Sequence, residues 1–167
     1  MSRTAAALGS VIFFFVAPSV VAGGIPWWIT RWKIRPPFLG LEVFRVIGAG
    51  LIFAGGVGLI DSFGRFALQG LGTPAPIAPP TRLVVTGTYR HVRNPMYVAI
   101  LAAISGQALL FADWRLVIYG AVVWGAFHIF VVVYEEPRLE KTFGAQYQAL
   151  RTRVPRWIPR LTPRRGT

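Results

Sequence analysis

Long stretches without a charged residue constrain the fold of this chain more than any other feature. No Asp, Glu, Lys or Arg occurs in residues 4–30, 95–112 or 116–134. About 20 mostly apolar residues are enough for a helix to cross the hydrocarbon core of a bilayer. Because the backbone polar groups of a spanning segment must be satisfied internally, such segments are helical. The sequence therefore predicts an all-α fold, an integral membrane helical bundle.

Composition supports this interpretation and limits the number of domains. Hydrophobic residues make up 54% of the 167 residues and charged residues only 14%, whereas soluble domains carry about 25% charged residues. About four spanning helices would use most of the chain, so we expect a single domain over residues 1–167. The absence of cysteine excludes a disulfide framework and a thiolate nucleophile. Two histidines are too few for a histidine-rich metal centre, and we expect no metal site.

The apolar segments and their connections predict the order of the elements. We expect membrane spans at 5–26, 42–66, 95–112 and 116–134, a loop at 67–93 and a tail at 135–167. The short connection Asp113-Trp114-Arg115 makes the last two spans an antiparallel helical hairpin. Glycines in the second span should let a neighbouring helix approach closely. A cleaved signal peptide is the alternative interpretation of the first segment, because Arg3 precedes its apolar run.

The distribution of basic residues predicts the orientation. The tail holds eight of the eighteen Lys and Arg residues, which predicts that it lies in the cytoplasm. We expect the protein in an inner or cytoplasmic membrane. The net charge of +12 lies beside apolar segments and in the tail, a pattern that favours contact with membrane lipids over nucleic acid. The same orientation puts Arg31, Lys33 and Arg35 outside, against the positive-inside rule, so the sequence leaves the orientation of the first helix open.

Polar residues cluster at the two ends of the predicted hairpin. Glu135 and Glu136 follow its second helix, and a carboxylate at membrane depth is costly unless it is paired. They either meet functional donors or are the first residues to reach water. Arg93 precedes Asn94 and Pro95, which suit the N-cap and first turn of the first helix. Because the two helices are antiparallel and nearly equal in length, we expect Arg93 to lie near both glutamates.

The order of these motifs resembles a known superfamily. The stretch "GTYRHVRNPMYVA", one helical hairpin and then "YEEPRLEKTFGAQYQALRTRVPRWIP" resemble the isoprenylcysteine carboxyl methyltransferase and phospholipid methyltransferase superfamily of integral membrane enzymes. The resemblance covers residues 70–160. It implies methyl transfer from S-adenosylmethionine, held on the cytoplasmic side, to a lipid-like or other hydrophobic small-molecule substrate. Asn94 replaces the usual histidine of isoprenylcysteine enzymes, and Val131 stands where eukaryotic carboxyl methyltransferases tend to have arginine; prenylcysteine is therefore not implied as the substrate.

The resemblance also implies roles for particular residues. Glu136 would hold the ribose or act as a base, and Arg93 would grip the methionyl carboxylate or orient an anionic acceptor. These two are the expected catalytic residues. The full set of expected cofactor-binding residues is Gly70, Gly72, Tyr89, Arg93, Asn94, Pro95, Tyr97, Glu135, Glu136 and Tyr147.

Rival functions also follow from the sequence. A non-catalytic membrane subunit or lipid-binding protein would use Arg93 and the glutamates only to stabilise the bundle. A nicotinamide-dependent reductase is the other alternative, because sterol reductases resemble the C-terminal arrangement, but no G-x-G-x-x-G motif is present. His128, in the middle of the last span, is interpreted as a packing residue in preference to a proton carrier. The sequence leaves the methylated atom and the oligomeric state open.

Overall fold

The computed structural model describes residues 16–69 and 83–160, and every regular element in these ranges is helical. A first helix runs from residue 16 to Thr30 and contains the π-helical turn η1 (Val20–Gly24) and α2 (Ile25–Thr30). The short 3₁₀ helix η2 (Phe38–Gly40) leads into α3 (Val43–Gln69). The remaining elements are η3 (Gly87–Arg90), α4 (Pro95–Phe111), α5 (Trp114–Phe130), η4 (Val131–Glu135), α6 (Glu136–Phe143) and α7 (Ala145–Arg153).

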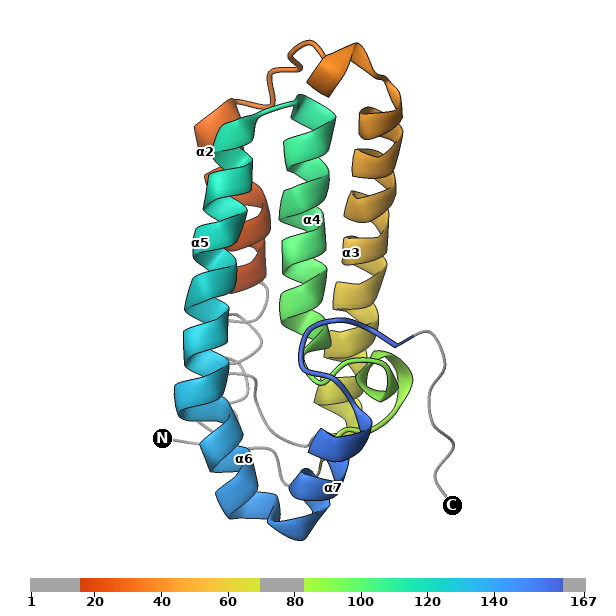
Figure 1. The fold of residues 1–167 in the computed structure, drawn as a ribbon, viewed down its shortest axis with the longest axis vertical. Helices are drawn as coiled ribbons and strands as arrows, with labels where there is room; N and C mark the ends of the chain where they lie inside the picture. The colour runs from red at the N-terminus through yellow and green to blue at the C-terminus, as the bar shows by residue number, and fades with distance from the viewer. Residues whose placement is uncertain (1–15, 70–82, 161–167) are drawn as a thin grey trace.

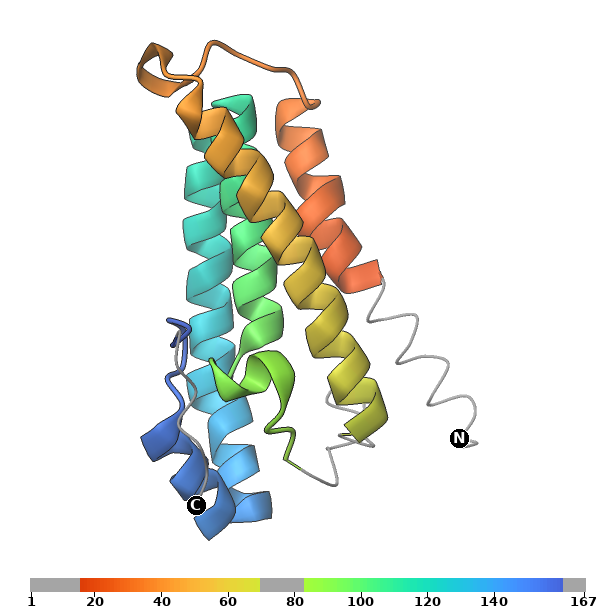
Figure 2. The same ribbon diagram turned by 90° about the vertical axis from the view of Figure 1, so that its right-hand side faces the viewer.

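Helix α4 lies between α3 and α5 (Figure 1), and α3 crosses the bundle at a tilt (Figure 2). Glycines permit the close approach of α3 to α4. A Cβ on Gly106 would lie 2.6 Å from the carbonyl oxygen of Gly48, and a Cβ on Gly55 would lie 2.7 Å from that of Ala99. Both distances are shorter than a carbon can tolerate against backbone oxygen. The predicted close packing of the glycine-rich segment is confirmed.

The π-helical turn η1 is joined to the bundle through its carbonyl groups. The Gln107 amide donates to the Ala22 oxygen over 2.6 Å, and the Tyr119 hydroxyl donates to the Val21 oxygen over 2.8 Å. A π-helical turn frees carbonyl groups from the regular α-helical ladder, and in an apolar environment such groups need donors. Two polar side chains therefore attach the first helix to α4 and α5.

An ionic cluster closes the turn between α4 and α5 at the upper end in Figure 1. Asp113 is fully buried, caps α5 by accepting from the Arg115 backbone N–H, and accepts from the Arg115 guanidinium at 2.7 and 3.0 Å. Arg35 lies 3.4 Å from the same carboxylate, and its backbone N–H donates to Phe111. The cluster therefore joins the segment before α3 to the α4–α5 turn.

Two helices are long and apolar enough to cross a membrane, Val43–Arg65 and Trp114–Phe143, and α4 is a shorter apolar helix. Large apolar side chains on α3 and α5 point away from the protein, including Phe53 and Ile60, each 75% exposed. The fold is that of an all-α helical membrane protein, as predicted. The last long helix does not end at residue 134; α5, η4 and α6 form one rod, so the glutamate pair lies inside a helix. The part of the expected span 5–26 before residue 16 lies outside the described residues.

The chain reverses after α6 and returns to the bundle. Gly144 has φ +48°, a conformation that side chains rarely adopt, and it separates α6 from α7. Residues 154–160, the C-terminal strap, then run back past the start of α4. The Arg93 N–H donates to the Pro155 oxygen over 2.9 Å, and the Arg160 N–H donates to the His91 oxygen over 3.0 Å. The strap brings its side chains over the glutamate pair.

Candidate functional site

Glu136 is the centre of a buried ionic cluster at the lower end of the bundle. Its residue is only 6% exposed. Arg93 Nη1 donates to Oε1 over 2.9 Å, Arg156 Nε donates to the same oxygen over 2.7 Å, and Arg156 Nη2 donates to Oε2 over 2.8 Å. The predicted proximity of Arg93 to a glutamate of the pair is confirmed. Three elements far apart in sequence meet at this carboxylate: the approach to α4, the start of α6 and the C-terminal strap.

Arg93 is held on several sides. Its backbone N–H binds the strap, and its Nη1 also donates to the Tyr147 hydroxyl over 3.2 Å. Its side chain is 10% exposed. The Nε atom is buried and has no hydrogen-bond partner among the described residues. A buried donor without a partner is uncommon in folded proteins.

Glu135 has a different environment from its neighbour. Its Oε2 accepts from the Tyr97 hydroxyl over 3.0 Å, and it forms no ion pair with a described residue. The Tyr97 ring lies 4.6 Å from Phe127 and 6.5 Å from Trp157, measured between ring centroids. An aromatic wall formed by α4, α5 and the strap therefore lies beside this carboxylate.

His128 belongs to the same wall. The Trp157 indole donates to His128 Nδ1 over 3.2 Å, and the Trp124 ring lies 5.3 Å from the imidazole. Because an indole nitrogen only donates, Nδ1 is the acceptor in this contact. The contacts fit the predicted packing role for His128, which holds the strap against α5.

Asp61, on α3, fixes the turn that carries Tyr89. Its Oδ2 accepts from the backbone N–H and the hydroxyl of Thr88 over 3.2 and 3.0 Å, and its Oδ1 accepts from Arg65 over 2.8 Å. Gly87 has φ +56°, and a Cβ there would overlap the Arg65 guanidinium. The positive φ favours glycine at this position. The sequence did not predict that Asp61 would fix this turn.

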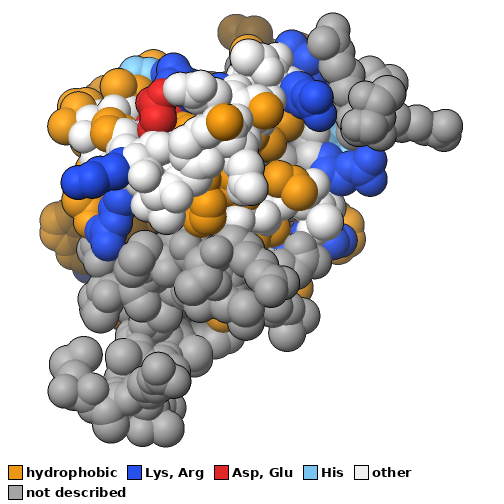
Figure 3. Space-filling model, turned by 90° about the horizontal axis from the view of Figure 1, so that it is seen from below, with side chains coloured by type: hydrophobic (Ala, Val, Ile, Leu, Met, Phe, Trp, Pro, Cys, Tyr) orange, Lys and Arg blue, Asp and Glu red, His pale blue; other side chains and the backbone are white. Residues whose placement is uncertain are grey.

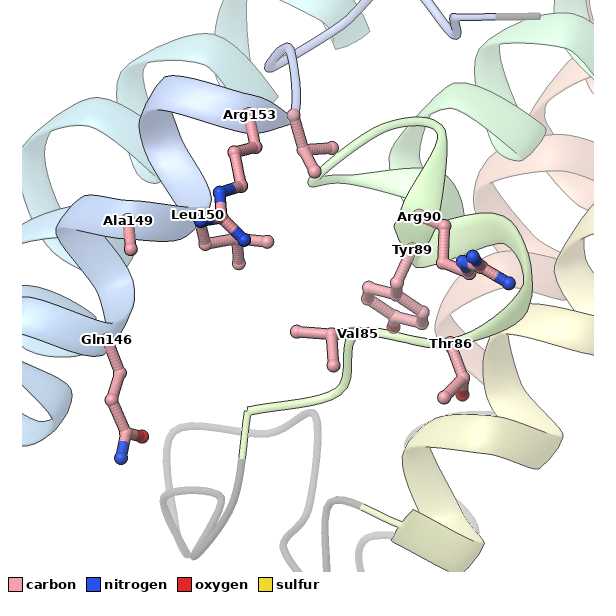
Figure 4. A pocket seen from close by; sticks show the side chains of 9 residues that line it. Val85, Thr86, Tyr89, Arg90, Gln146, Ala149, Leu150 and Arg153 are labelled. Atoms are coloured by element: carbon pink, nitrogen blue, oxygen red, sulfur yellow. The ribbon is translucent and has the colours of Figure 1, made fainter. Parts of the chain in front are cut away.

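Tyr89 lies on the wall of a cavity of about 440 Å³ between η3 and α7 (Figure 4). Burial, together with the negative charges of Glu135 and Asp61, raises the pKa of the Tyr89 phenol. Burial likewise raises the pKa of Tyr147. Both phenols therefore remain protonated at neutral pH and are able to donate hydrogen bonds.

Most of the sequence-predicted site residues gather at this end of the molecule. Arg93, Tyr97, Glu135, Glu136 and Tyr147 lie in the two hydrogen-bonded groups described above. Pro95 is buried in the first turn of α4. Gly70 and Gly72 lie outside the described residues.

The predicted N-cap position of Asn94 is confirmed, but its side chain does not cap the helix α4. Instead the amide donates to the Arg156 backbone oxygen over 3.2 Å. The amide faces the strap and not the helix, so Asn94 holds the segment that delivers the second arginine to Glu136.

Arg156 is the functional candidate that sequence reasoning missed. It supplies two of the three charge-assisted hydrogen bonds to Glu136, and this ion pair raises the pKa of its guanidinium. A signal was present in the tail motif "VPRWIP", where Arg156 stands between Pro155 and Trp157. Lys and Arg side chains are spread over the described surface at this end of the molecule (Figure 3), so their number alone did not single out Arg156.

The comparisons with known proteins agree with this geometry. The family model described as phospholipid methyltransferase matches residues 43–146, a range that includes α3, η3, α4, α5 and the glutamate pair. No curated protein and no solved structure is similar enough to this chain to count as a match. The matched range covers more than half of the chain and both of its long apolar helices. The chain therefore belongs to the phospholipid methyltransferase family.

Proposed function

We propose that this protein transfers a methyl group from S-adenosylmethionine to a lipid-like acceptor at the membrane. Membership of a methyltransferase family supports the reaction class. The observation that carries the proposal is the convergence of Arg93 and Arg156 on Glu136 at the end of an apolar helical bundle. The cluster places buried charges of both signs where a polar cofactor would meet a membrane-embedded substrate.

The residues present fit the polar groups of this cofactor. Arg93, whose buried Nε has no partner within residues 16–69 and 83–160, suits the methionyl carboxylate. Glu136 accepts three hydrogen bonds from arginine and retains a lone pair on Oε2 for a ribose hydroxyl. Glu135, which has no cationic partner among the described residues, suits the amino group, and Tyr97 and Tyr147 offer phenolic hydroxyls.

When bound, S-adenosylmethionine supplies an electrophilic methyl group on a positively charged sulfur. The task left to the protein is to align donor and acceptor and to exclude water. The aromatic wall formed by Tyr97, Phe127 and Trp157 excludes water beside Glu135. The strap, fixed by backbone hydrogen bonds to His91 and Arg93, covers the cluster. We assign Arg93 and Glu136 to binding and orienting the cofactor. Both side chains form charge-assisted hydrogen bonds within the protein, so neither is a free base or acid.

Binding of the product S-adenosylhomocysteine to purified protein in detergent tests the proposal by calorimetry. We expect the wild-type protein to bind it and Glu136→Gln to weaken binding by about tenfold or more, because a hydrogen bond to a charged group contributes about 1.5 to 3 kcal/mol. Glu140→Gln is the matched control, since Glu140 lies on the same helix and pairs on the surface with Arg151. Helical content and thermal midpoint of each variant report on folding.

The same measurement separates the rival functions. Wild-type protein that binds neither S-adenosylhomocysteine nor a nicotinamide dinucleotide would support a non-catalytic subunit. Binding of a nicotinamide dinucleotide in its place would support a reductase. An equal loss of affinity for S-adenosylhomocysteine in Glu136→Gln and Glu140→Gln would overturn the assignment of Glu136 to cofactor binding.

A further inference from the structure

Both histidines of the chain contact the C-terminal strap. The sequence contains only His91 and His128. His91 Nδ1 lies 2.6 Å from the Arg160 backbone oxygen, and His128 Nδ1 lies 3.2 Å from Nε1 of Trp157. Histidine is the side chain that ordinarily changes its charge between about pH 5 and 8. The strap, dark blue at the lower end of the bundle in Figure 1, is therefore held at two points by groups that can titrate near neutral pH.

Protonation affects these two contacts in opposite ways. A carbonyl oxygen only accepts, so His91 is the donor to Arg160 and remains a donor when its ring is charged. An indole nitrogen only donates, so His128 must offer a lone pair to Trp157. An imidazolium carries an N–H on both nitrogens and has no such lone pair. A proton on His128 therefore removes the hydrogen bond and leaves two donors facing each other, whereas the His91 contact persists.

No charged group of the described residues forms an ion pair with His128. On its own helix the imidazole packs against Trp124, at 5.3 Å between ring centroids. The first helix, residues 16–30, carries no charged side chain. The titratable groups that other elements bring to this aromatic wall are Tyr97 from α4, Glu135 from η4 and Arg156 from the strap. Each of the three has a partner elsewhere, so the Trp157 indole is the polar partner of this ring.

The contact with Trp157 lies next to the residue that binds Glu136. Arg156 precedes Trp157 in the strap and donates to both oxygens of Glu136. The Asn94 amide holds the same residue by its backbone oxygen, over 3.2 Å. Because Arg156 and Trp157 share one stretch of backbone, the position of the indole affects how the guanidinium reaches the carboxylate. His128 therefore acts on the Glu136 cluster through the strap.

We propose that His128 positions the strap in a pH-dependent way. The neutral imidazole binds Trp157 and keeps the strap closed over the Glu136 cluster, and the protonated imidazole releases Trp157 and loosens the strap. His128 is thus a positioning residue that acts through Trp157 and Arg156. The consequence for retention of the cofactor rests on the proposed function, whereas the movement of the strap does not.

Amide hydrogen exchange of the full-length protein in detergent tests the movement without any ligand. The Arg93 N–H donates to Pro155 and reports on the strap, whereas the Arg35 N–H donates to Phe111 and reports on the other end of the bundle. Protection is the rate in an unstructured peptide divided by the measured rate at the same pH. From about pH 8 to about pH 5 we expect protection of the Arg93 amide to fall at least about fivefold, the effect of losing one hydrogen bond to a partly buried donor. Protection of the Arg35 amide should stay within about twofold.

Single substitutions distinguish His128 from other titrating groups. In His128→Gln the amide oxygen still accepts from the indole and does not titrate, so protection should be high and independent of pH. Trp157→Phe keeps a ring but has no donor, and its protection should be low at both pH values. His91→Gln keeps a donor for Arg160 and is the matched control, which should retain the wild-type response to pH.

Three results would overturn the proposal. The first is a protection of the Arg93 amide that does not change with pH in the wild-type protein. The second is a pH response that persists in His128→Gln, because another group, such as a carboxylate, would then be the one that titrates. The third is loss of the response in His91→Gln, which would assign the effect to the other histidine.

The dissociation rate of S-adenosylhomocysteine separates this proposal from the proposed function. We expect the rate to rise about fivefold from about pH 8 to about pH 5 in the wild-type protein and not in His128→Gln, in parallel with the loss of protection. If protection depends on pH through His128 but S-adenosylhomocysteine does not bind, the role of His128 stands and the methyl-transfer proposal fails. If S-adenosylhomocysteine binds and protection does not depend on pH, the role of His128 fails alone.

Discussion

Glu136 and its two arginines form a polar site in which the protein pairs both carboxylate oxygens. Arg156 binds both carboxylate oxygens, whereas Arg93 shares one of them, and its Nε has no hydrogen-bond partner among the described residues. This difference divides their roles. Arg156 orients the carboxylate and attaches the strap, and Arg93 retains a donor for a ligand.

Replacement of Arg156 by lysine tests the orienting role. Lysine keeps the charge but cannot provide the planar pair of donors that reaches both oxygens. We expect Arg156→Lys to lower the free energy of unfolding by about 1 kcal/mol, the net contribution of one such hydrogen bond. Thermal unfolding in detergent, followed by circular dichroism, measures the change. Arg151→Lys, in an exposed pair with Glu140, is the control, and an equal loss in both variants would contradict the assigned role.

At the scale of elements, the contact between α3 and α4 depends on the absence of side chains. A Cβ at Gly106 meets backbone atoms of Gly48 and Ile52, which cannot rotate away. We expect Gly106→Ala to destabilise the protein by about 1 to 3 kcal/mol, the usual cost of overpacking. The thermal midpoint in detergent measures it.

The control for this prediction lies on α3 itself. No atom of the described residues lies within 4 Å of a Cβ built on Gly56, and alanine has a higher helix propensity than glycine. Gly56→Ala should leave the midpoint unchanged or raise it. Similar destabilisation by both substitutions would show that glycine content, and not the close contact, is what matters.

The Asp113 cluster joins three elements and predicts a pH dependence. Hydrogen bonds from Arg115, assisted by the charge of Arg35, hold the pKa of Asp113 below its ordinary value. The cluster therefore stabilises the fold at pH above about 4, the ordinary pKa of aspartate, and this contribution is lost as pH falls through the lower folded-state pKa.

Asp113→Asn removes the titrating group and keeps an N-cap residue. Unfolding at pH 7 should show wild-type protein to be more stable than this variant by about 1 to 2 kcal/mol. The difference should shrink as pH falls from about 5 to 2. A difference that stays constant over this range would contradict the ionic role of the carboxylate.

Some elements could be predicted from the sequence because their cause is local. Uncharged apolar runs predicted α4 and the long helix that begins at Trp114, and the three-residue connection predicted their antiparallel pairing. The strap could not be predicted, because its course depends on the turn at Gly144 and on hydrogen bonds from Arg93 and Asn94, residues about 60 positions earlier. The site was therefore predicted up to Arg93 and the glutamates, without Arg156.

At the scale of the whole molecule, the two ends of the bundle have different character. The upper end is closed by the Asp113 cluster, and the lower end combines buried ion pairs, an aromatic wall and the cavity between η3 and α7. The α3 and α5 surfaces between them expose large apolar side chains. An amphiphile moving in the bilayer would therefore keep its acyl chains against these apolar helix surfaces while its polar group reached the site at the lower end.

Transfer of a labelled methyl group tests the central claim most directly. The protein, reconstituted in phospholipid vesicles, is supplied with S-adenosylmethionine that carries a deuterated methyl group, and the extracted lipids are analysed by mass spectrometry. We predict a lipid whose mass rises by one labelled methyl group with wild-type protein and not with Arg93→Ala, while Lys141→Gln behaves as wild type. The contradicting result is that no lipid carries the label although the wild-type protein in the vesicles is folded and binds S-adenosylhomocysteine. That result would exclude lipid methylation as the function.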